Sequence, residues 1–247
     1  MKVFRRQFCG IKIYKVIDMK RCLALVISIM IVLSMSAQEK KYSDHYYKRV
    51  NQFEQEAPIT KWDIVLLGDS LTEGGDWSEY FSETEAKLSK KGGAIRNRGI
   101  VGDTAEGIYD RLDQILPGKP RKLFFLCGAN DVSHDLSADT IVARIEKVLC
   151  KIMVQSPKTK LYLQSMLPFN ESFKRYKKLN GKTYMVAQIN EKLEQLAKKL
   201  KITFVNLHPL FLEEGTANLN PEITGDGLHL KKEGYAIWKE AIKGYVK

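Results

Sequence analysis

The fold is read most clearly from the stretch Asp63-Ile64-Val65-Leu66-Leu67-Gly68-Asp69-Ser70-Leu71-Thr72. Its apolar residues run without alternating polar ones, which predicts a strand over Asp63–Leu67 that is buried on both faces, as in a parallel sheet. Gly68 and Asp69 interrupt the apolar run. Ser70 is therefore expected at the carboxyl end of a strand, where the chain turns toward a helix.

Further strands and helices alternate along the rest of the chain. Helical spacing of three and four is seen in Ile141, Ile145, Val148 and Ile152, and again from Val186 to Leu200. A last helix is expected from about Lys231 to Tyr245. The other short runs of β-branched and aromatic residues predict strands at Ala94–Asn97, Leu123–Cys127, Lys160–Gln164 and Ile202–Asn206. This order predicts a doubly wound α/β sandwich with a parallel sheet.

Residues 1–37 have the organisation of a secretory signal peptide. Lys20-Arg21 precede an uncharged apolar run, Leu23–Met35, and small residues follow in Ser34-Met35-Ser36-Ala37. The run is shorter than the roughly 20 residues that span a bilayer. We therefore expect cleavage after Ala37, a periplasmic or secreted protein and no stable membrane insertion afterwards. Met19, which directly precedes the basic pair, is an alternative start site.

The rest of the chain is expected to form one domain with a short lead-in. Residues 38–60 are polar, with a helical stretch around Tyr46–Phe53, and residues 61–247 carry the α/β pattern. The length of 247 residues and the 44% hydrophobic content suit one substantial α/β core. Nothing in the sequence specifies an oligomeric state.

The net charge of +11 has a local origin. Seven basic residues and one acidic residue lie within residues 1–37, so the remainder has 33 basic and 28 acidic side chains, a net charge of +5. The lysines around Lys174–Lys182 and Lys198–Lys201 lack the interleaved aromatic residues of an RNA-binding module. We therefore expect no nucleic-acid partner.

The cysteines do not form a disulfide or metal-binding framework. Cys127 and Cys150 remain after the predicted signal peptide, and no Cys-x-x-Cys spacing occurs. Both are expected as buried thiols rather than as a bridge.

Ser70 and His229 are the candidate nucleophile and base. A serine hydroxyl needs a base to take its proton, and Asp226 lies three residues before His229, where a carboxylate can orient the imidazole. Taken separately, Ser70 could cap a helix and Asp226 could cap the last helix. Of the other histidines, only His134 has an adjacent acid, Asp135, and it is kept as a residue that lines the cleft.

Two further blocks follow predicted strands and offer hydrogen-bond donors for an oxyanion. Asn97–Thr104 contains Gly102, and Cys127–Asp131 contains Asn130. Each block alone is also typical of an ordinary turn.

Together and in this order, the blocks resemble the SGNH hydrolase family, also called GDSL esterases and lipases. The resemblance covers essentially the whole chain after the signal peptide. It implies Ser70 as nucleophile, Asp226 and His229 as its partners, and an oxyanion hole formed by Ser70, Gly102 and Asn130. It also implies a flavodoxin-like three-layer α/β/α sandwich with a five-stranded parallel sheet, no cofactor and no metal.

The function predicted on this basis is an exported serine esterase that hydrolyses short-chain acyl esters, above all acetyl esters, on a small molecule or glycan. The loops Asn170–Gly181 and Glu213–Gly225 are expected to flank the cleft, with Phe173 and Tyr176 as stacking platforms. A lysophospholipase or thioesterase is the alternative, in which residues such as Trp77 would form an acyl wall instead of helix core. A non-catalytic glycan-binding module is the alternative of another class. A nucleotide or flavin binder is disfavoured because no glycine-rich phosphate loop follows the first strand.

Overall fold

The computed structural model describes residues 41–247, so the predicted signal peptide lies outside the described residues. Residues 42–247 form one compact unit. Its centre is a five-stranded, fully parallel sheet in the order β2-β1-β3-β4-β5. The strands are β1 (Ile64–Gly68), β2 (Ile95–Gly99), β3 (Lys122–Leu126), β4 (Lys160–Gln164) and β5 (Thr203–Val205). The prediction of a five-stranded parallel sheet is confirmed, and the expected strands overlap the observed ones.

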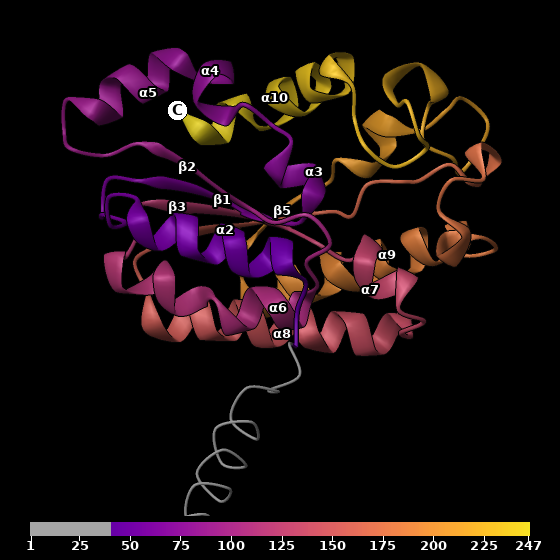
Figure 1. Cartoon of the computed structure of the whole chain (residues 1–247), viewed down its shortest axis with the longest axis horizontal. Coiled ribbons are helices and arrows are strands. Elements are labelled where there is room, and N and C mark those ends of the chain that lie inside the picture. The colour runs from indigo at the N-terminus through magenta and orange to yellow at the C-terminus, as the bar shows by residue number, and fades with distance from the viewer. Residues whose placement is uncertain (1–40) are drawn as a thin grey trace, which may run out of the picture. The chain divides into compact units, whose positions relative to one another are not determined.

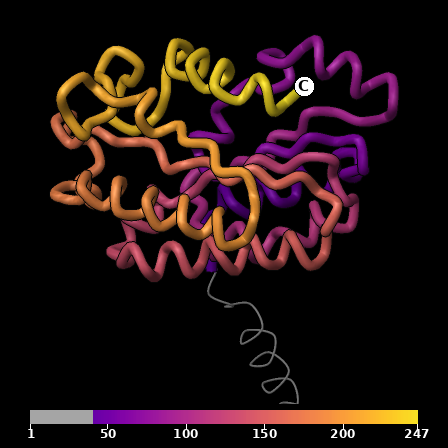
Figure 2. Tube along the Cα trace, turned by 180° about the vertical axis from the view of Figure 1, so that it is seen from behind, coloured from indigo at the N-terminus to yellow at the C-terminus, as the bar shows by residue number. Residues whose placement is uncertain are grey.

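Helices cover both faces of the sheet, which confirms the three-layer α/β/α sandwich (Figure 1). One layer contains α3 (Ser70–Glu73), α4 (Trp77–Tyr80), α5 (Ser82–Ser89) and α10 (Lys232–Val246). The other contains α6 (Ala105–Asp110), α8 (Ala138–Gln155) and α9 (Thr183–Leu200), and the view from behind shows the same separation (Figure 2). Successive residues of β1 serve opposite layers, because side chains alternate across a strand. Val65 joins the core beneath α8 and α9, whereas Leu66 joins the core beneath α10.

The aromatic residues that follow Ser70 belong to this second core. Trp77 is 1% exposed, and its ring lies edge-on to that of Trp238 with the centroids 5.0 Å apart. Its indole nitrogen donates to the carbonyl of Thr72 at 2.8 Å. Trp77 is therefore helix core and not an acyl wall.

The lead-in contributes helix α2 (Asp44–Gln55), close to where its pattern predicted a helix. Ser43 caps it by accepting a hydrogen bond from the Tyr46 N–H at 3.1 Å. The Tyr46 hydroxyl donates to the carbonyl of Gly107 at 3.0 Å, and Phe53 packs with Ile100. The lead-in thus packs beside the segment that follows β2.

The two remaining cysteines are both free thiols, but only one matches its predicted burial. Cys127 is buried after β3, whereas Cys150 is exposed on α8. The prediction of burial was wrong for Cys150 because it lies off the apolar stripe of that helix, whose buried residues are Ile141, Ile145, Val148, Leu149 and Ile152.

Helices within residues 41–247 are all too short or too polar to cross a membrane.

Candidate active site

Ser70 is placed by the tight turn between β1 and α3. It is the first residue of α3, and Asp69 caps the helix by accepting the Leu71 N–H at 3.0 Å. Gly68 permits this turn, because a Cβ there would collide with the Thr72 hydroxyl and the Leu126 carbonyl. The serine at this position faces the pocket instead of acting as the helix cap.

Asp226 and His229 lie on a short turn before α10. The Asp226 Oδ1 atom accepts the backbone N–H groups of Leu228 at 2.9 Å and of His229 at 2.8 Å. The Thr224 hydroxyl donates to the His229 carbonyl at 2.7 Å. Gly227 has φ of +86°, and a Cβ there would meet the Asn170 carbonyl, so the turn requires glycine. The carboxylate therefore shapes its own loop and is not the cap of α10.

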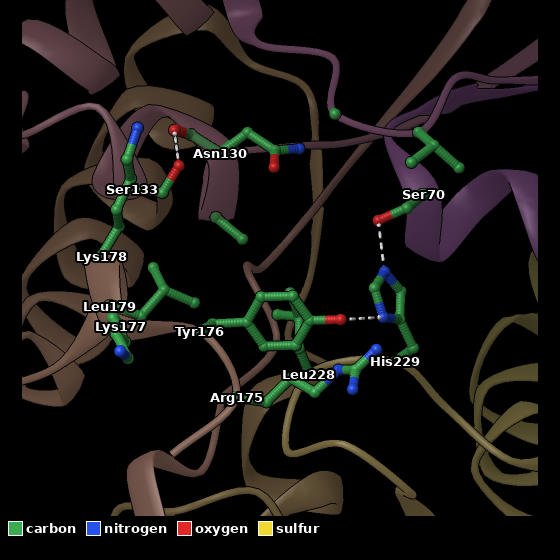
Figure 3. Close-up of a pocket in the computed structure, with 13 residues that line it drawn as sticks. Ser70, Asn130, Ser133, Arg175, Tyr176, Lys177, Lys178, Leu179, Leu228 and His229 are labelled. Atoms are coloured by element: carbon green, nitrogen blue, oxygen red, sulfur yellow. Dashed lines mark hydrogen bonds between the residues drawn. The ribbon is translucent and has the colours of Figure 1, made fainter. Parts of the chain in front are cut away.

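These elements bring three predicted residues into one hydrogen-bonded chain, of which Figure 3 shows the contact between Ser70 and His229. His229 Nε2 lies 3.0 Å from Ser70 Oγ, although the two residues are 159 positions apart in sequence. His229 Nδ1 lies 2.8 Å from Asp226 Oδ2. Burial alone would raise the pKa of Asp226, but hydrogen bonds from His229, Leu228 and Tyr176 outweigh burial and hold that pKa well below its usual range. Asp226 is therefore ionised and accepts the Nδ1 proton.

Tyr176 joins this chain, a contact that the sequence did not predict. Its hydroxyl donates to Asp226 Oδ2 at 2.8 Å and lies 3.0 Å from His229 Nδ1 (Figure 3). Burial, followed by the bond to Asp226, raises the pKa of Tyr176, which keeps the hydroxyl protonated. Tyr176 lines the pocket as expected, but its hydroxyl is engaged with the histidine and carboxylate. Phe173, its predicted companion, packs beside Gly227 and lies outside the pocket lining.

Gly102 and Asn130 approach the same pocket from the ends of β2 and β3. Gly102 has φ of +79°, and within the described residues no acceptor is bonded to its N–H group. One N–H of the Asn130 amide donates to the Asp103 carbonyl at 2.8 Å, which leaves its second N–H available. The Ser70 N–H, at the first position of its helix, has no intrahelical acceptor. The three predicted oxyanion donors therefore surround one pocket.

Three buried carboxylates support these donors from behind. Asp69, Asp103 and Asp131 each adjoin one of the predicted donor residues in sequence and are at most 3% exposed. Arg111 Nε donates to Asp103 Oδ2 at 2.8 Å. Burial raises the pKa of Asp69 to about 7 and that of Asp103 to about 6, the latter offset in part by Arg111. Arg111 also donates to the Gly68 carbonyl at 3.0 Å, and Asp131 Oδ2 accepts the Ala105 N–H at 3.0 Å. These bonds link the loops that carry the three predicted donors.

The pocket has a volume of about 420 Å³. Besides Ser70, His229, Gly102 and Asn130, its lining comes mainly from the loop after β4. That loop contributes Arg175, Tyr176, Lys177, Lys178 and Leu179, and the other lining residues are Val101, Ala129, Ser133 and Leu228. The expectation that the loop Asn170–Gly181 flanks the cleft therefore holds for its residues Arg175–Leu179.

Two other expectations about the cleft were wrong. No residue of Glu213–Gly225 lines the pocket, because that loop is closed on itself, with the Glu213 N–H donating to the Asn218 carbonyl at 2.9 Å. His134 also lies outside the lining, since it ends the helix α7 (Ala129–Ser133) and only Ser133 and the residues at its start reach the pocket.

Several known proteins are similar to this chain in sequence or in fold. A model of the GDSL-like Lipase/Acylhydrolase family matches residues 66–237, a range that includes every residue of the hydrogen-bonded chain. A solved GDSL-like lipase from Bacteroides thetaiotaomicron is 25% identical, with a TM-score of 0.66 over 81% of this chain and 96% of that one. The acetyl xylan esterase AlAXEase is 23% identical, with a TM-score of 0.60 over 75% of this chain and 100% of that one.

A curated relative is the N-acylneuraminate cytidylyltransferase of Escherichia coli O18:K1:H7, which is 23% identical over 224 residues. The match covers 87% of this chain but 49% of the relative, so this chain spans about half the length of that protein.

Proposed function

Because the chain belongs to the GDSL-like lipase/acylhydrolase family and is a carboxylic ester hydrolase, we propose that it is an exported serine esterase acting on short-chain acyl esters. Acetyl esters carried on carbohydrate are the preferred substrates in this proposal. The observation that carries it is the hydrogen-bonded chain from Ser70 through His229 to Asp226, which opens into a pocket with Gly102 and Asn130.

In the proposed reaction, Ser70 Oγ attacks the ester carbonyl while His229 Nε2 takes the hydroxyl proton. The oxyanion accepts hydrogen bonds from the N–H groups of Ser70 and Gly102 and from the free N–H of Asn130. The carbon–oxygen bond to the alcohol then breaks, and His229 gives its proton to the leaving oxygen. Water attacks the acyl-serine while His229 Nε2 takes a proton from it. The bond between the acyl carbon and Ser70 Oγ then breaks, His229 returns the proton to Oγ, and the carboxylic acid is released. Asp226 keeps the Nδ1 proton in place throughout.

Replacing the nucleophile tests this mechanism. Ser70→Ala should abolish turnover of p-nitrophenyl acetate and labelling by a fluorophosphonate probe, while circular dichroism stays unchanged because little side-chain volume is lost. Ser89→Ala, an exposed serine on α5, is the matched control and should keep both signals. Retained turnover in Ser70→Ala would show that another residue is the nucleophile.

The proposal of a short acyl chain carried on a glycan is supported by the charged and polar residues of the pocket lining and by the extended apolar surface that a long acyl chain would need. Each buried methylene is worth about 0.8 kcal/mol, so an enzyme for long chains gains by presenting an extended apolar groove. Here the apolar residues Val101, Leu179 and Leu228 share the pocket with charged and polar side chains. The AlAXEase structure, named an acetyl xylan esterase, has a similar fold, which therefore accommodates such a reaction.

A lysophospholipase or thioesterase is the second candidate, and the apolar part of the pocket wall favours it. The deciding measurement is kcat/KM for p-nitrophenyl esters from acetate to palmitate, followed by acetate release from acetylated sialic acid and acetylated xylan. A steady rise toward long chains, or no acetate from either glycan, would favour the lipid substrate. A non-catalytic glycan-binding module would instead bind these glycans without releasing acetate and would not react with the fluorophosphonate.

Export is proposed from the sequence of residues 1–37. The mature protein should begin at Gln38, after the small residues that end with Ala37. N-terminal sequencing of the protein recovered from periplasm or medium tests this. A mature form that retains Leu23–Met35 would place the esterase at a membrane.

A further inference from the structure

We propose that the substrate of this esterase is an anion, and that Arg175, Lys177 and Lys178 bind its carboxylate or phosphate beside Ser70. The inference rests on the proposed function, because it concerns the ester bound in the same pocket. It deepens that function by assigning a charge to the substrate.

The three cations line the pocket directly. Figure 3 shows Arg175 on the side of the pocket near His229, and Lys177 and Lys178 beside Leu179, across Tyr176. All three side chains are exposed, so their charged groups are accessible to a ligand that enters the pocket. The lining contains no carboxylate, because Asp226 lies behind the imidazole and is bonded to it.

These cations also lack the carboxylate partners that neighbouring lysines have. Lys182 pairs with Asp135 at 2.5 Å, and along α9 the three residues Lys192, Lys198 and Lys199 each pair with an acid. Within residues 41–247, no such ion pair involves Arg175, Lys177 or Lys178. Unpaired charges of one sign around a pocket raise the local concentration of oppositely charged ligands.

Glu171 is the only acidic residue of the loop Asn170–Gly181, and backbone N–H groups bind its carboxylate. Both oxygens of Glu171 accept N–H groups, from Gly181 at 2.6 Å and from Lys182 and Thr183 at 2.9 Å each. Those bonds, with one from the Thr183 hydroxyl, outweigh burial and lower the pKa of Glu171. Glu171 thus remains ionised where it ties the two ends of the segment together, away from the pocket lining.

The backbone that presents the cations is anchored on both sides. The Asn170 N–H donates to the Gly227 carbonyl at 2.7 Å, and its side-chain amide donates to the Leu219 carbonyl at 2.9 Å. At the other end Leu179 is 4% exposed and belongs to the main core. The backbone that carries the cations is therefore held in place before a substrate binds, which lowers the entropy cost of forming a charged contact.

An arginine and two lysines together can bind either a carboxylate or a phosphate. The guanidinium fork suits the paired oxygens of a carboxylate or a phosphate, and the ammonium groups add point charges. The carboxylate of an acidic sugar and the phosphate of a glycerol headgroup therefore share the chemistry proposed here. Substrates that differ only in this group separate the two sources.

The test compares matched esters that release acetate. One pair is acetylated glucuronic acid and its neutral methyl ester, and the other is acetylglycerol phosphate and acetylglycerol. We expect kcat/KM to be higher for the anion in at least one pair, and to fall with added salt for that anion alone. Preference within the sugar pair identifies a carboxylate, and preference within the glycerol pair identifies a phosphate.

Variants then assign the preference to the loop. Arg175→Gln/Lys177→Gln/Lys178→Gln should lower kcat/KM for the preferred anion by about tenfold more than for its neutral partner, in line with three exposed charge contacts. Lys192→Gln/Lys198→Gln/Lys199→Gln removes the same charge from α9 and should leave the preference intact, which controls for net charge.

Equal rates within both pairs, or equal losses for anion and neutral ester in the pocket variant, would overturn the inference while leaving the esterase assignment intact. Failure of the proposed function looks different, because then no member of either pair is hydrolysed and Ser70 is not labelled.

Discussion

Asp226→Asn is the substitution whose effect the geometry defines best. Asp226 Oδ1 is held by two backbone N–H groups, so the asparagine should keep its carbonyl oxygen there and turn its amide nitrogen toward His229. A donor would then face Nδ1, which lies 2.8 Å from Asp226 Oδ2 in the native protein. The imidazole would respond by placing its proton on Nε2, where it can no longer accept the proton of Ser70.

A wrong tautomer at this position lowers kcat by about 10⁴-fold in an established serine hydrolase, which corresponds to about 5.5 kcal/mol of transition-state stabilisation. Here the expected loss is smaller, about 10³-fold, because the Tyr176 hydroxyl lies 3.0 Å from Nδ1 and can accept its proton in place of the carboxylate. Adding Tyr176→Phe removes that substitute acceptor. The double variant should therefore lose about a further tenfold in kcat. Its total loss should then approach the roughly 10⁴-fold loss of a serine hydrolase that lacks such a hydroxyl.

The assay is kcat for p-nitrophenyl acetate at neutral pH, with fluorophosphonate labelling and thermal unfolding to show that each variant is folded. The three variants and the wild type form a double-mutant cycle. A rate near that of the wild type in Asp226→Asn would refute the role given to the carboxylate. Strict additivity of the two substitutions would refute the substitute role given to Tyr176.

Three further outcomes follow from the same structure. Tyr176→Phe alone should lower kcat by no more than about twofold, because Asp226 still orients His229, and a tenfold fall in kcat for this single variant would contradict the role given to Tyr176. Asn130→Ala should lower kcat by about two orders of magnitude with little change in KM, and a pure KM effect would make Asn130 a substrate-binding residue. Burial raises the pKa of Asp69 to about 7 from 3.8, so its ionisation lowers the free energy of unfolding as pH rises between these values. Asp69→Asn keeps the acceptor for the Leu71 N–H. Urea unfolding should show that this variant is more stable than the wild type at pH 8, by up to about 4 kcal/mol. At pH 4 the two proteins should be equally stable.

The sequence by itself determined the sheet and the identity of the candidate site residues. β1, β3, β4 and β5 are built on local runs of apolar residues, whereas β2 (Ile95–Gly99) is largely polar. Lys160–Gln164 was predicted with the bounds that the structure shows. Asp226 and His229 are close in sequence, so their contact depends on one turn. Because parallel strands place their carboxyl ends at one edge of a sheet, residues that follow β1, β2 and β3 had to lie near one another.

The tertiary structure alone decided what surrounds those residues. Tyr176 and the three unpaired cations come from a loop with no periodicity, and their positions depend on distant anchors such as the contact of Asn170 with Gly227. The exposure of Cys150, by contrast, follows from helical spacing alone, because at about 100° per residue it lies on the side of α8 opposite Ile141. Local patterns indicate which residues are buried. The direction and pairing of a loop side chain are instead set by contacts between segments far apart in the chain, which no short stretch of sequence encodes.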